Sequence, residues 1–292
     1  MSNKITPFIR CVDNGKAVAE YYTSIFPEAK ILKSNPIVTE FEIFGQTLAT
    51  IQWGENDNAT LNPSISFSLW IKDKDLTKQI WDKLADGGTV MMPFDKYMRS
   101  PAYGRCNDKY GVSRQVMYDD RPESTTAHHN LVPSLLFVGA NAGKAQEAMD
   151  LYTSIFPAGK IDFVRKYEEG EGEKVGNIAH AEFKLANQQF IIADSGLDHK
   201  FQFNDGVSLS VSCADQAEVD SYRNALIADG GSEVQCGWCK DKYGVSRQIT
   251  PVGMEKLLFS PDKEKSDRAM QAMLQMKKLD IAQMQKAYDG IA

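Results

Sequence analysis

The stretch Asp108–Gln115, DKYGVSRQ, returns unchanged as Asp241–Gln248. A second stretch, Tyr22–Pro27, YTSIFP, returns unchanged as Tyr152–Pro157. The displacements are nearly equal, at 133 positions for the first pair (241 − 108) and 130 for the second (152 − 22). Two long identities at nearly one spacing indicate that the chain is two tandem copies of one unit. Its 292 residues are about twice the length of an ordinary domain, which agrees with duplication.

Each copy has the same predicted order of elements: an apolar strand, a helix, three strands, a second helix and further strands. The first helices, residues 15–26 and 142–156, each end at a proline that cannot continue a helix. The second helices begin after Asp73 and Asp215, which are typical N-cap residues. The remaining segments alternate apolar and polar residues, as strands with one buried face do. The order predicts an α+β fold of βαβββ modules whose mixed sheets are curved, with helices on the outer side.

The repeat sets the predicted domain bounds, at residues 1–120 and 131–260 with a linker at 121–130. The tail at 261–292 is predicted to be one long helix, whose apolar stripe we expect to dock on its own domain rather than on a second chain. The copies differ in length at two places, where we predict loops. One of these, 93–104 in copy one, contains the basic and aromatic segment 96–103, which is predicted as a lid, with a solvated loop as the alternative.

Charge and hydropathy exclude several classes of protein. The chain has 33 Lys and Arg against 39 Asp and Glu, for a net charge of −6, and no basic run that would follow a phosphate backbone. We therefore expect no nucleic-acid partner. There is no stretch of eighteen apolar residues and no apolar leader, so we also expect no membrane association and a cytoplasmic location. The 5 cysteines suit reduced thiols better than a disulfide framework.

Family resemblance enters with the segment Gln235–Gln248, QCGWCKDKYGVSRQ, which is similar to the closing segment of PhnB-like proteins. Tyr22–Pro27 and the tail segment Met273–Ala282 are similar to that group too, so the resemblance covers essentially the whole chain. The chain resembles a tandem PhnB-like protein of the vicinal-oxygen-chelate (glyoxalase, bleomycin resistance, dioxygenase) superfamily, in the group often labelled 3-demethylubiquinone-9 3-methyltransferase-like. That resemblance implies two tandem glyoxalase-like domains of paired βαβββ modules, with curved mixed sheets around a cavity.

The resemblance also implies a metal site, but this chain lacks the residues that usually bind the metal. Metal-dependent members place His or Glu on the first strand of a module and Glu near its last strand. Here the last-strand positions are Gln115 and Gln248, and the first strands, 5–12 and 131–138, contain no His, Asp or Glu. We predict no metal site and no other cofactor. The two glutamines are interpreted as neutral hydrogen-bonding groups for a polar ligand, with a purely structural role as the alternative.

Other side chains are candidates for the ligand site. His180 is the one histidine inside a predicted strand, two residues before Glu182, and is either a general base or ligand contact or a structural histidine. Trp53 and Trp238 are predicted to supply aromatic area to an apolar pocket, although such residues are more often core. The spacing CxxC at 236–239 is that of a redox pair or half a zinc site, but no second such pair exists.

Arg114 and Arg247 stand where the family usually has Trp, and each is predicted to pair with a carboxylate or to lie at a cavity rim. Taken together, the residues favour a metal-free protein that binds a small organic molecule, sequestering or sensing it. The alternative is a metal-dependent lyase, isomerase or dioxygenase acting on a vicinal-oxygen substrate. We do not carry over the methyltransferase label, because no Gly-rich loop joins a strand to a helix. The ligand, the copy that binds it and the choice between monomer and homodimer stay open.

Overall fold

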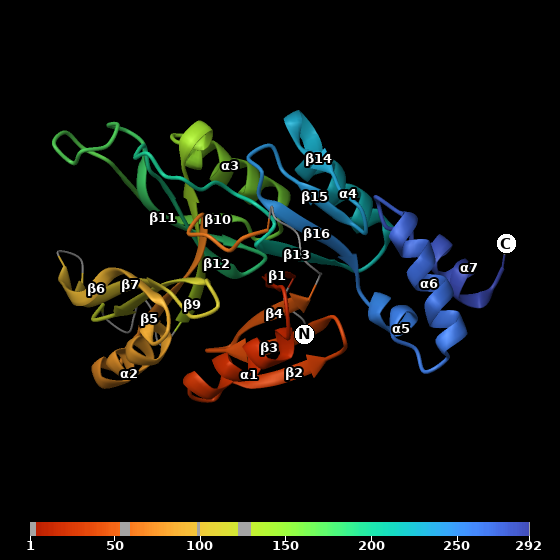
Figure 1. The fold of residues 1–292 in the computed structure, drawn as a ribbon. Helices are drawn as coiled ribbons and strands as arrows, with labels where there is room; N and C mark the ends of the chain where they lie inside the picture. The colour runs from red at the N-terminus through yellow and green to blue at the C-terminus, as the bar shows by residue number, and fades with distance from the viewer. Residues whose placement is uncertain (1–3, 53–58, 98–99, 122–129, 292) are drawn as a thin grey trace. The chain divides into compact units, whose positions relative to one another are not determined.

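We analysed a computed structural model of the chain, which describes residues 4–52, 59–97, 100–121 and 130–291 (Figure 1). The chain divides into two compact units. The larger is Ile9–Gln202, and the smaller combines Met1–Phe8 with Phe203–Ala292. Each unit is considered by itself below.

The larger unit holds two complete modules and most of a third. Strand β1, Ile5–Cys11, begins in the smaller unit and ends in the larger one. The elements that follow β1 in the larger unit are α1 Gly15–Ile25, β2 Lys30–Ser34, β3 Val38–Ile43, β4 Gln46–Gln52, β5 Ile65–Ile71, α2 Lys74–Ala85, β6 Thr89–Tyr97, β7 Ser100–Asn107, β8 Ser113–Tyr118, β9 Asn130–Phe137, α3 Ala145–Ile155, β10 Lys160–Lys166, β11 Ile178–Leu185 and β12 Gln188–Asp194.

One mixed sheet of eight strands lies wholly in this unit, in the order β10-β11-β12-β9-β5-β8-β7-β6. Within each module the first strand pairs in parallel with the last, β5 with β8 and β9 with β12. The modules join where β5 pairs antiparallel with β9. This sheet therefore combines the second module of copy one with the first module of copy two. The domain bounds derived from the repeat follow the copies and not the sheets, and they stay a prediction.

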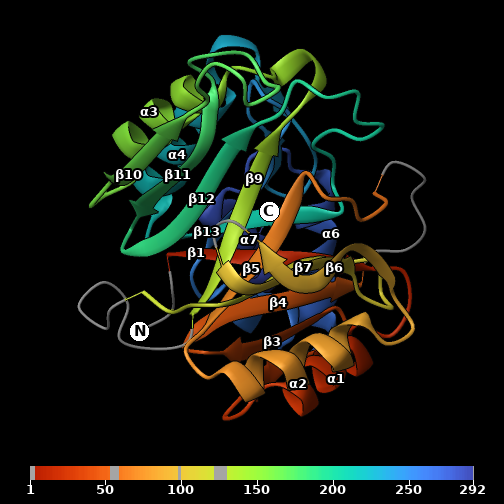
Figure 2. The same ribbon diagram turned by 90° about the vertical axis from the view of Figure 1, so that its left-hand side faces the viewer.

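The two faces of this sheet differ in what covers them. Helix α2 packs on one face, because a Cβ at Gly104 of β7 would lie 2.6 Å from the ring of Trp81 in α2. Figure 2 shows α3 running alongside β10 and β11, and Phe183 of β11 is fully buried. On each strand, the residues next to Gly104 and Phe183 point to the opposite face, since successive side chains of a strand alternate between the two faces. We call that opposite side the helix-free face. It carries Ser66, Ser68, Trp70, Tyr103, Arg105, Gln115, Met117, Asn130, Val132, Ser134, His180, Glu182, Gln189 and Ile191.

The smaller unit repeats the module and adds the tail. Its elements are β13 Val207–Cys213, α4 Gln216–Ile227, β14 Ser232–Glu233, β15 Trp238–Lys240, β16 Ser246–Pro251, α5 Met254–Leu258, α6 Lys263–Gln275 and α7 Ile281–Asp289. Strands β13 and β16 pair in parallel, as β5 and β8 do. In this unit the strands lie in the order β14-β15-β16-β13-β1, and in the larger unit β4, β3 and β2 are neighbours in that order. Two mixed sheets with helices give an α+β fold, as the sequence predicts.

Local signals in the sequence account for the helix bounds. Asp73 accepts a hydrogen bond from the N–H of Leu76 at 2.8 Å, and Asp215 accepts one from the N–H of Glu218 at 2.9 Å. Both predicted N-caps are thus confirmed. Helices α1 and α3 both stop two residues before the proline of the repeated hexapeptide, which confirms the predicted stop.

Two predictions of local structure are wrong. The tail is not one helix, because α6 ends at Gln275 and α7 begins at Ile281. The intervening carbonyls of Met276 and Lys277 accept hydrogen bonds from the N–H groups of Cys236 and Gly237, at 2.7 and 2.9 Å, and an unbroken helix would keep those carbonyls for itself. The tail does dock on its own unit, as predicted.

The second wrong prediction is the loop at residues 93–104. Its described residues lie in the antiparallel strands β6 and β7, so they extend the sheet instead of forming a lid. A length difference between the copies was interpreted as a loop, whereas a hairpin absorbs extra residues equally well. Among the residues that the structure describes, no helix is long and apolar enough to span a membrane.

Candidate functional site

The repeated octapeptide forms a buried turn in copy one. Asp108 Oδ1 accepts hydrogen bonds from the N–H groups of Tyr110 and Val112, at 3.0 and 3.1 Å. Its Oδ2 accepts from Arg114 Nε at 3.1 Å and from the hydroxyl of Tyr22 at 2.9 Å. Burial raises the pKa of Tyr22 well above its usual value, so this hydroxyl stays protonated and donates. One carboxylate therefore fixes the turn, the strand that follows it and helix α1.

Copy two repeats the arrangement. Asp241 Oδ1 accepts from the N–H groups of Tyr243 and Val245, at 3.1 and 3.0 Å, and Asp241 Oδ2 accepts from Arg247 Nη2 at 3.1 Å. Both arginines are fully buried. The prediction that each guanidinium pairs with a carboxylate is confirmed. These arginines lie on the helix side of their sheets and are structural. The Asp and Arg contacts that hold the turn therefore account for much of the identity of the octapeptide in the two copies.

The last residue of the octapeptide points the other way, onto the helix-free face. Gln115 Nε2 donates to Ser66 Oγ at 2.9 Å, and Gln115 Oε1 accepts from the hydroxyl of Tyr103 at 2.9 Å. In the smaller unit Gln248 Nε2 donates to Ser208 Oγ at 2.8 Å. Each glutamine thus binds a serine on the first strand of its own module. Hydroxyl and amide groups occupy the positions where a metal would need carboxylates or imidazoles.

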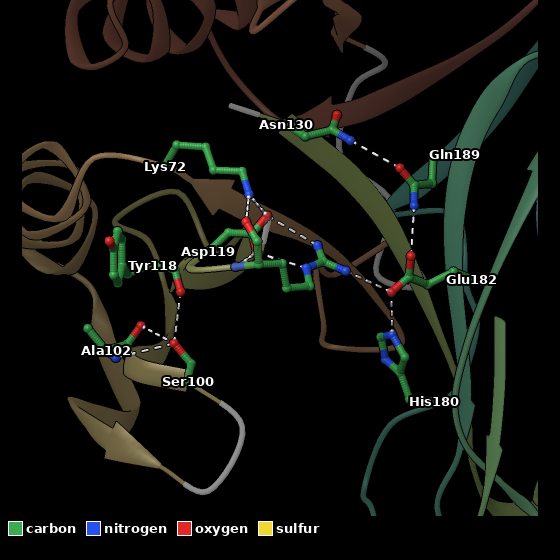
Figure 3. A network of polar contacts seen from close by, with 10 residues as sticks. Lys72, Ser100, Ala102, Tyr118, Asp119, Asn130, His180, Glu182 and Gln189 are labelled. Atoms are coloured by element: carbon green, nitrogen blue, oxygen red, sulfur yellow. Dashed lines mark hydrogen bonds and ion pairs between the residues drawn. The ribbon is translucent and has the colours of Figure 1, made fainter. Parts of the chain in front are cut away.

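A second polar cluster lies on the same face at β11 and β12. His180 Nε2 and Glu182 Oε1 are 3.1 Å apart, and Glu182 Oε2 accepts from Gln189 Nε2 at 2.9 Å. Gln189 Oε1 in turn accepts from Asn130 Nδ2 at 3.1 Å. Figure 3 shows this line of contacts from Asn130 to His180. An ionised carboxylate only accepts, so His180 Nε2 is the donor, and in the neutral ring Nδ1 is left as an acceptor.

Glu182 also joins an ion-pair network. Arg121 Nη1 lies 3.4 Å from Glu182 Oε1, and Arg121 Nε lies 2.8 Å from Asp119 Oδ1. Lys72 Nζ lies 3.1 Å from Asp119 Oδ2. The guanidinium of Arg121 stacks over Trp70, with its carbon 4.4 Å from the ring centroid. Two cations and two carboxylates balance within this network, so its net charge is zero when His180 is neutral.

Between the two polar clusters the helix-free face is apolar. Trp70, Val132 and Ile191 form a buried cluster with Met117 packed against it. Ser68 and Ser134 bind each other through their hydroxyls at 2.8 Å and are also buried. The face thus has a buried apolar centre, which Met117 extends, with polar groups on both sides; small-molecule sites combine apolar and polar side chains in this way.

The predicted site residues do not form one constellation. Gln115, His180 and Glu182 share the helix-free face, with His180 and Glu182 in contact and Gln115 several strands away. Gln248 and Trp238 belong to the smaller unit, where they lie opposite each other on β16 and β15. Trp53 lies outside the described residues.

Sequence reasoning missed further polar residues on this face. They are Ser66, Tyr103, Arg105, Asp119, Arg121, Asn130 and Gln189. For Tyr103 and Arg105 a signal existed, because the small residues at 102, 104 and 106 alternate with Tyr103 and Arg105, as the two faces of a strand do. The network residues Asp119 and Arg121 gave no such signal, since they lie at the junction of the predicted first domain and the linker.

Neither metal nor thiol chemistry fits the described residues. No group of three or more His, Cys, Asp or Glu among them could hold a metal ion. Burial raises the pKa of Cys239 to about 11 and also raises that of Cys236. The reactive thiolate is therefore disfavoured at both positions. The CxxC segment instead serves the tail, whose carbonyls its N–H groups bind.

A cavity of about 490 Å³ lies elsewhere in the larger unit, at the start of α1. Its lining includes Cys11, Asn14, Val18, Leu61 and Tyr110, and none of the predicted site residues. Burial, with a smaller contribution from Asp108, raises the pKa of Cys11 to about 12, so this thiol is no nucleophile.

Comparison with known families agrees with this geometry. The family described as 3-demethylubiquinone-9 3-methyltransferase matches residues 3–117 and again residues 129–250. The chain belongs to that family. Each match covers one copy, so the family unit occurs twice in the chain. No match was found among curated proteins.

Several solved structures are similar to this chain. A putative 3-demethylubiquinone-9 3-methyltransferase, the PhnB protein from Bacillus cereus, is 36% identical over 41% of this chain and 96% of its own, with a TM-score of 0.38. Glyoxalase I from Zea mays is 12% identical over 84% of this chain and 91% of its own, with a TM-score of 0.54. A putative dioxygenase from Bacillus subtilis is 11% identical over 98% and 96%, with a TM-score of 0.50. The last two likenesses show the fold alone: it is the glyoxalase-like, vicinal-oxygen-chelate fold.

Proposed function

We propose that this protein binds a small organic molecule on the helix-free face of the sheet formed by β5–β12, without a metal ion. It would thereby sequester or sense that molecule. The observation that carries the proposal is the environment of Gln115. Its amide is held by Ser66 and Tyr103, at 2.9 Å each, beside the apolar cluster of Trp70 and Met117. A neutral hydrogen-bonding group next to apolar area recognises an organic ligand directly.

The metal-dependent lyase, isomerase or dioxygenase stays the alternative. It would need carboxylate or imidazole ligands around the glutamine, and the neighbours there are the hydroxyls of Ser66 and Tyr103. His180 with Glu182 offers acid–base chemistry instead, but it belongs to the other polar cluster. The family description names a methyltransferase activity. This sequence has no Gly-rich loop between a strand and a helix, so it does not support that activity.

Met117 provides a direct test, because it packs against the apolar cluster of the helix-free face. With methyl-labelled methionine, we expect small aromatic compounds that bind to shift the Met117 NMR signal, identified by Met117→Leu. The shifts should be the same with and without EDTA. Met149, fully buried on the helix side, is the control and should not move. Shifts that appear only after a divalent metal is added would contradict the proposal and favour the enzyme.

A further inference from the structure

Arg105 is a cation on the helix-free face that has no ionic partner. It lies on β7 directly opposite Gln115 of β8, so the two side chains are cross-strand neighbours. Its Nε is buried and has no hydrogen-bond partner, and no carboxylate pairs with its guanidinium among the described residues. Asp95 lies opposite Tyr103 on the adjacent β6, and no ion pair joins its carboxylate to Arg105.

The lack of a partner is unusual for the charged groups of this face. Lys72 and Arg121 both pair with Asp119 in the network at the other side of the apolar cluster. A partly buried charge without a counter-charge costs stability, and an anionic ligand would supply the missing charge. Among the cations that we place on this face, Arg105 is the one without an ion pair in the described part of the chain.

The groups around Arg105 each have a donor left to offer. Gln115 uses its carbonyl oxygen for Tyr103 and one amide N–H for Ser66, which leaves its second N–H. Ser66 Oγ accepts from Gln115, which leaves its own O–H to donate. A guanidinium, an amide N–H and a hydroxyl on adjoining strands favour an oxyanion over a neutral or cationic group.

We propose that the ligand of this face is a small organic acid, whose carboxylate or phosphate oxygens pair with Arg105 beside Gln115 and Ser66. Its apolar body would lie against Met117, the partly buried residue that packs on the cluster of Trp70, Val132 and Ile191. This inference rests on the proposed function and names its ligand class.

The other copy supplies an internal comparison. In the smaller unit Trp238 lies opposite Gln248, as Arg105 lies opposite Gln115. Gln248 keeps its serine, Ser208, at 2.8 Å. Trp238 thus stands where the cation would be, and the anion site belongs only to the sheet formed by β5–β12.

The test compares an anion with its neutral analogue. Benzoate and phenyl phosphate are titrated against benzamide, with the Met117 methyl signal as the reporter, in the wild type and in Arg105→Gln. Charge-assisted hydrogen bonds imply that Arg105→Gln weakens binding of the anions about tenfold or more. Benzamide binding should change less than about twofold, because it has no charge to lose. Arg105→Lys keeps the charge and should retain the preference for anions over benzamide.

Lys78→Gln is the matched control, since it removes one positive charge from an exposed pair with Asp82 on α2. It should leave all three affinities unchanged. Equal binding of benzoate and benzamide, unaffected by Arg105→Gln, would overturn the anion inference and leave small-molecule binding intact. If none of the three compounds shifts Met117, both the inference and the proposed site are contradicted. Equal urea midpoints for the variants and the wild type exclude misfolding as the cause of any loss.

Discussion

Asp108→Asn should lower the free energy of unfolding by about 3–5 kcal/mol, the range observed when one partner of a buried ion pair is removed. Asp108 and Arg114 are no more than 2% exposed, so the guanidinium would keep its charge without a counter-ion. The amide of the new Asn would also place N–H donors against Arg114 Nε or the Tyr22 hydroxyl, which donate there now. Urea unfolding followed by fluorescence measures the change.

Asp82→Asn is the control for that experiment. Asp82 pairs with Lys78 one turn away on the exposed side of α2, at 2.7 Å. Exposed pairs of this kind contribute about 0.3–0.5 kcal/mol, so this variant should unfold nearly as the wild type does. Similar losses for Asp82→Asn and Asp108→Asn would show that Asp108 is not the buried centre of the turn.

Gly237→Ala should destabilise the smaller unit by about 3 kcal/mol or more, from left-handed backbone strain together with overpacking. Gly237 has φ +81, and an added Cβ would lie 2.8 Å from Leu279 and 2.9 Å from the carbonyl oxygen of Ile249. The residue cannot move away easily, because its N–H donates to the carbonyl of Lys277 at 2.9 Å. The loss should appear in urea unfolding and as faster proteolysis of the tail helices.

Gly253→Ala separates the two causes. Gly253 has nearly the same φ, +86, but nothing lies within 4 Å of an added Cβ. It should cost only the strain of a left-handed alanine, about 1–2 kcal/mol. If both variants lose the same stability and the tail stays resistant to protease, the docking of the tail on residues 235–238 is weaker than the contacts indicate.

The module was predictable because its signals are local. Asp73 and Asp215 fix helix starts through their own side chains, and the proline of the repeated hexapeptide fixes where α1 and α3 stop. The pairing of modules was not predictable from the same signals. Strands β5 and β9 are buried on both faces, so no solvent-facing side marks which neighbour each strand takes. The sheet that joins the two copies therefore emerged only from the structure.

The candidate site was predictable in part, for the same reason. Gln115 and the contact of His180 with Glu182 follow from strand positions that the sequence marks clearly. Arg105 was missed because residues 93–104 were interpreted as an inserted loop, so neighbouring residues were not assigned to a face. Glu182 accepts hydrogen bonds from Arg121 and Gln189, and only Gln189 is near it in sequence. Contacts between distant segments leave no trace in a single sequence.

The metal content of the protein tests the central claim, metal-free binding, most directly. It should be measured by inductively coupled plasma mass spectrometry on protein purified without chelator and without a histidine tag. Since hydroxyl and amide groups surround Gln115, we predict less than about 0.1 equivalent of any transition metal. Thermal midpoints should also not rise with Mg, Mn, Fe, Ni or Zn, because a bound metal would stabilise the folded state. A near-stoichiometric metal that is lost in Gln115→Ala or Gln248→Ala would contradict the account and establish a metal centre.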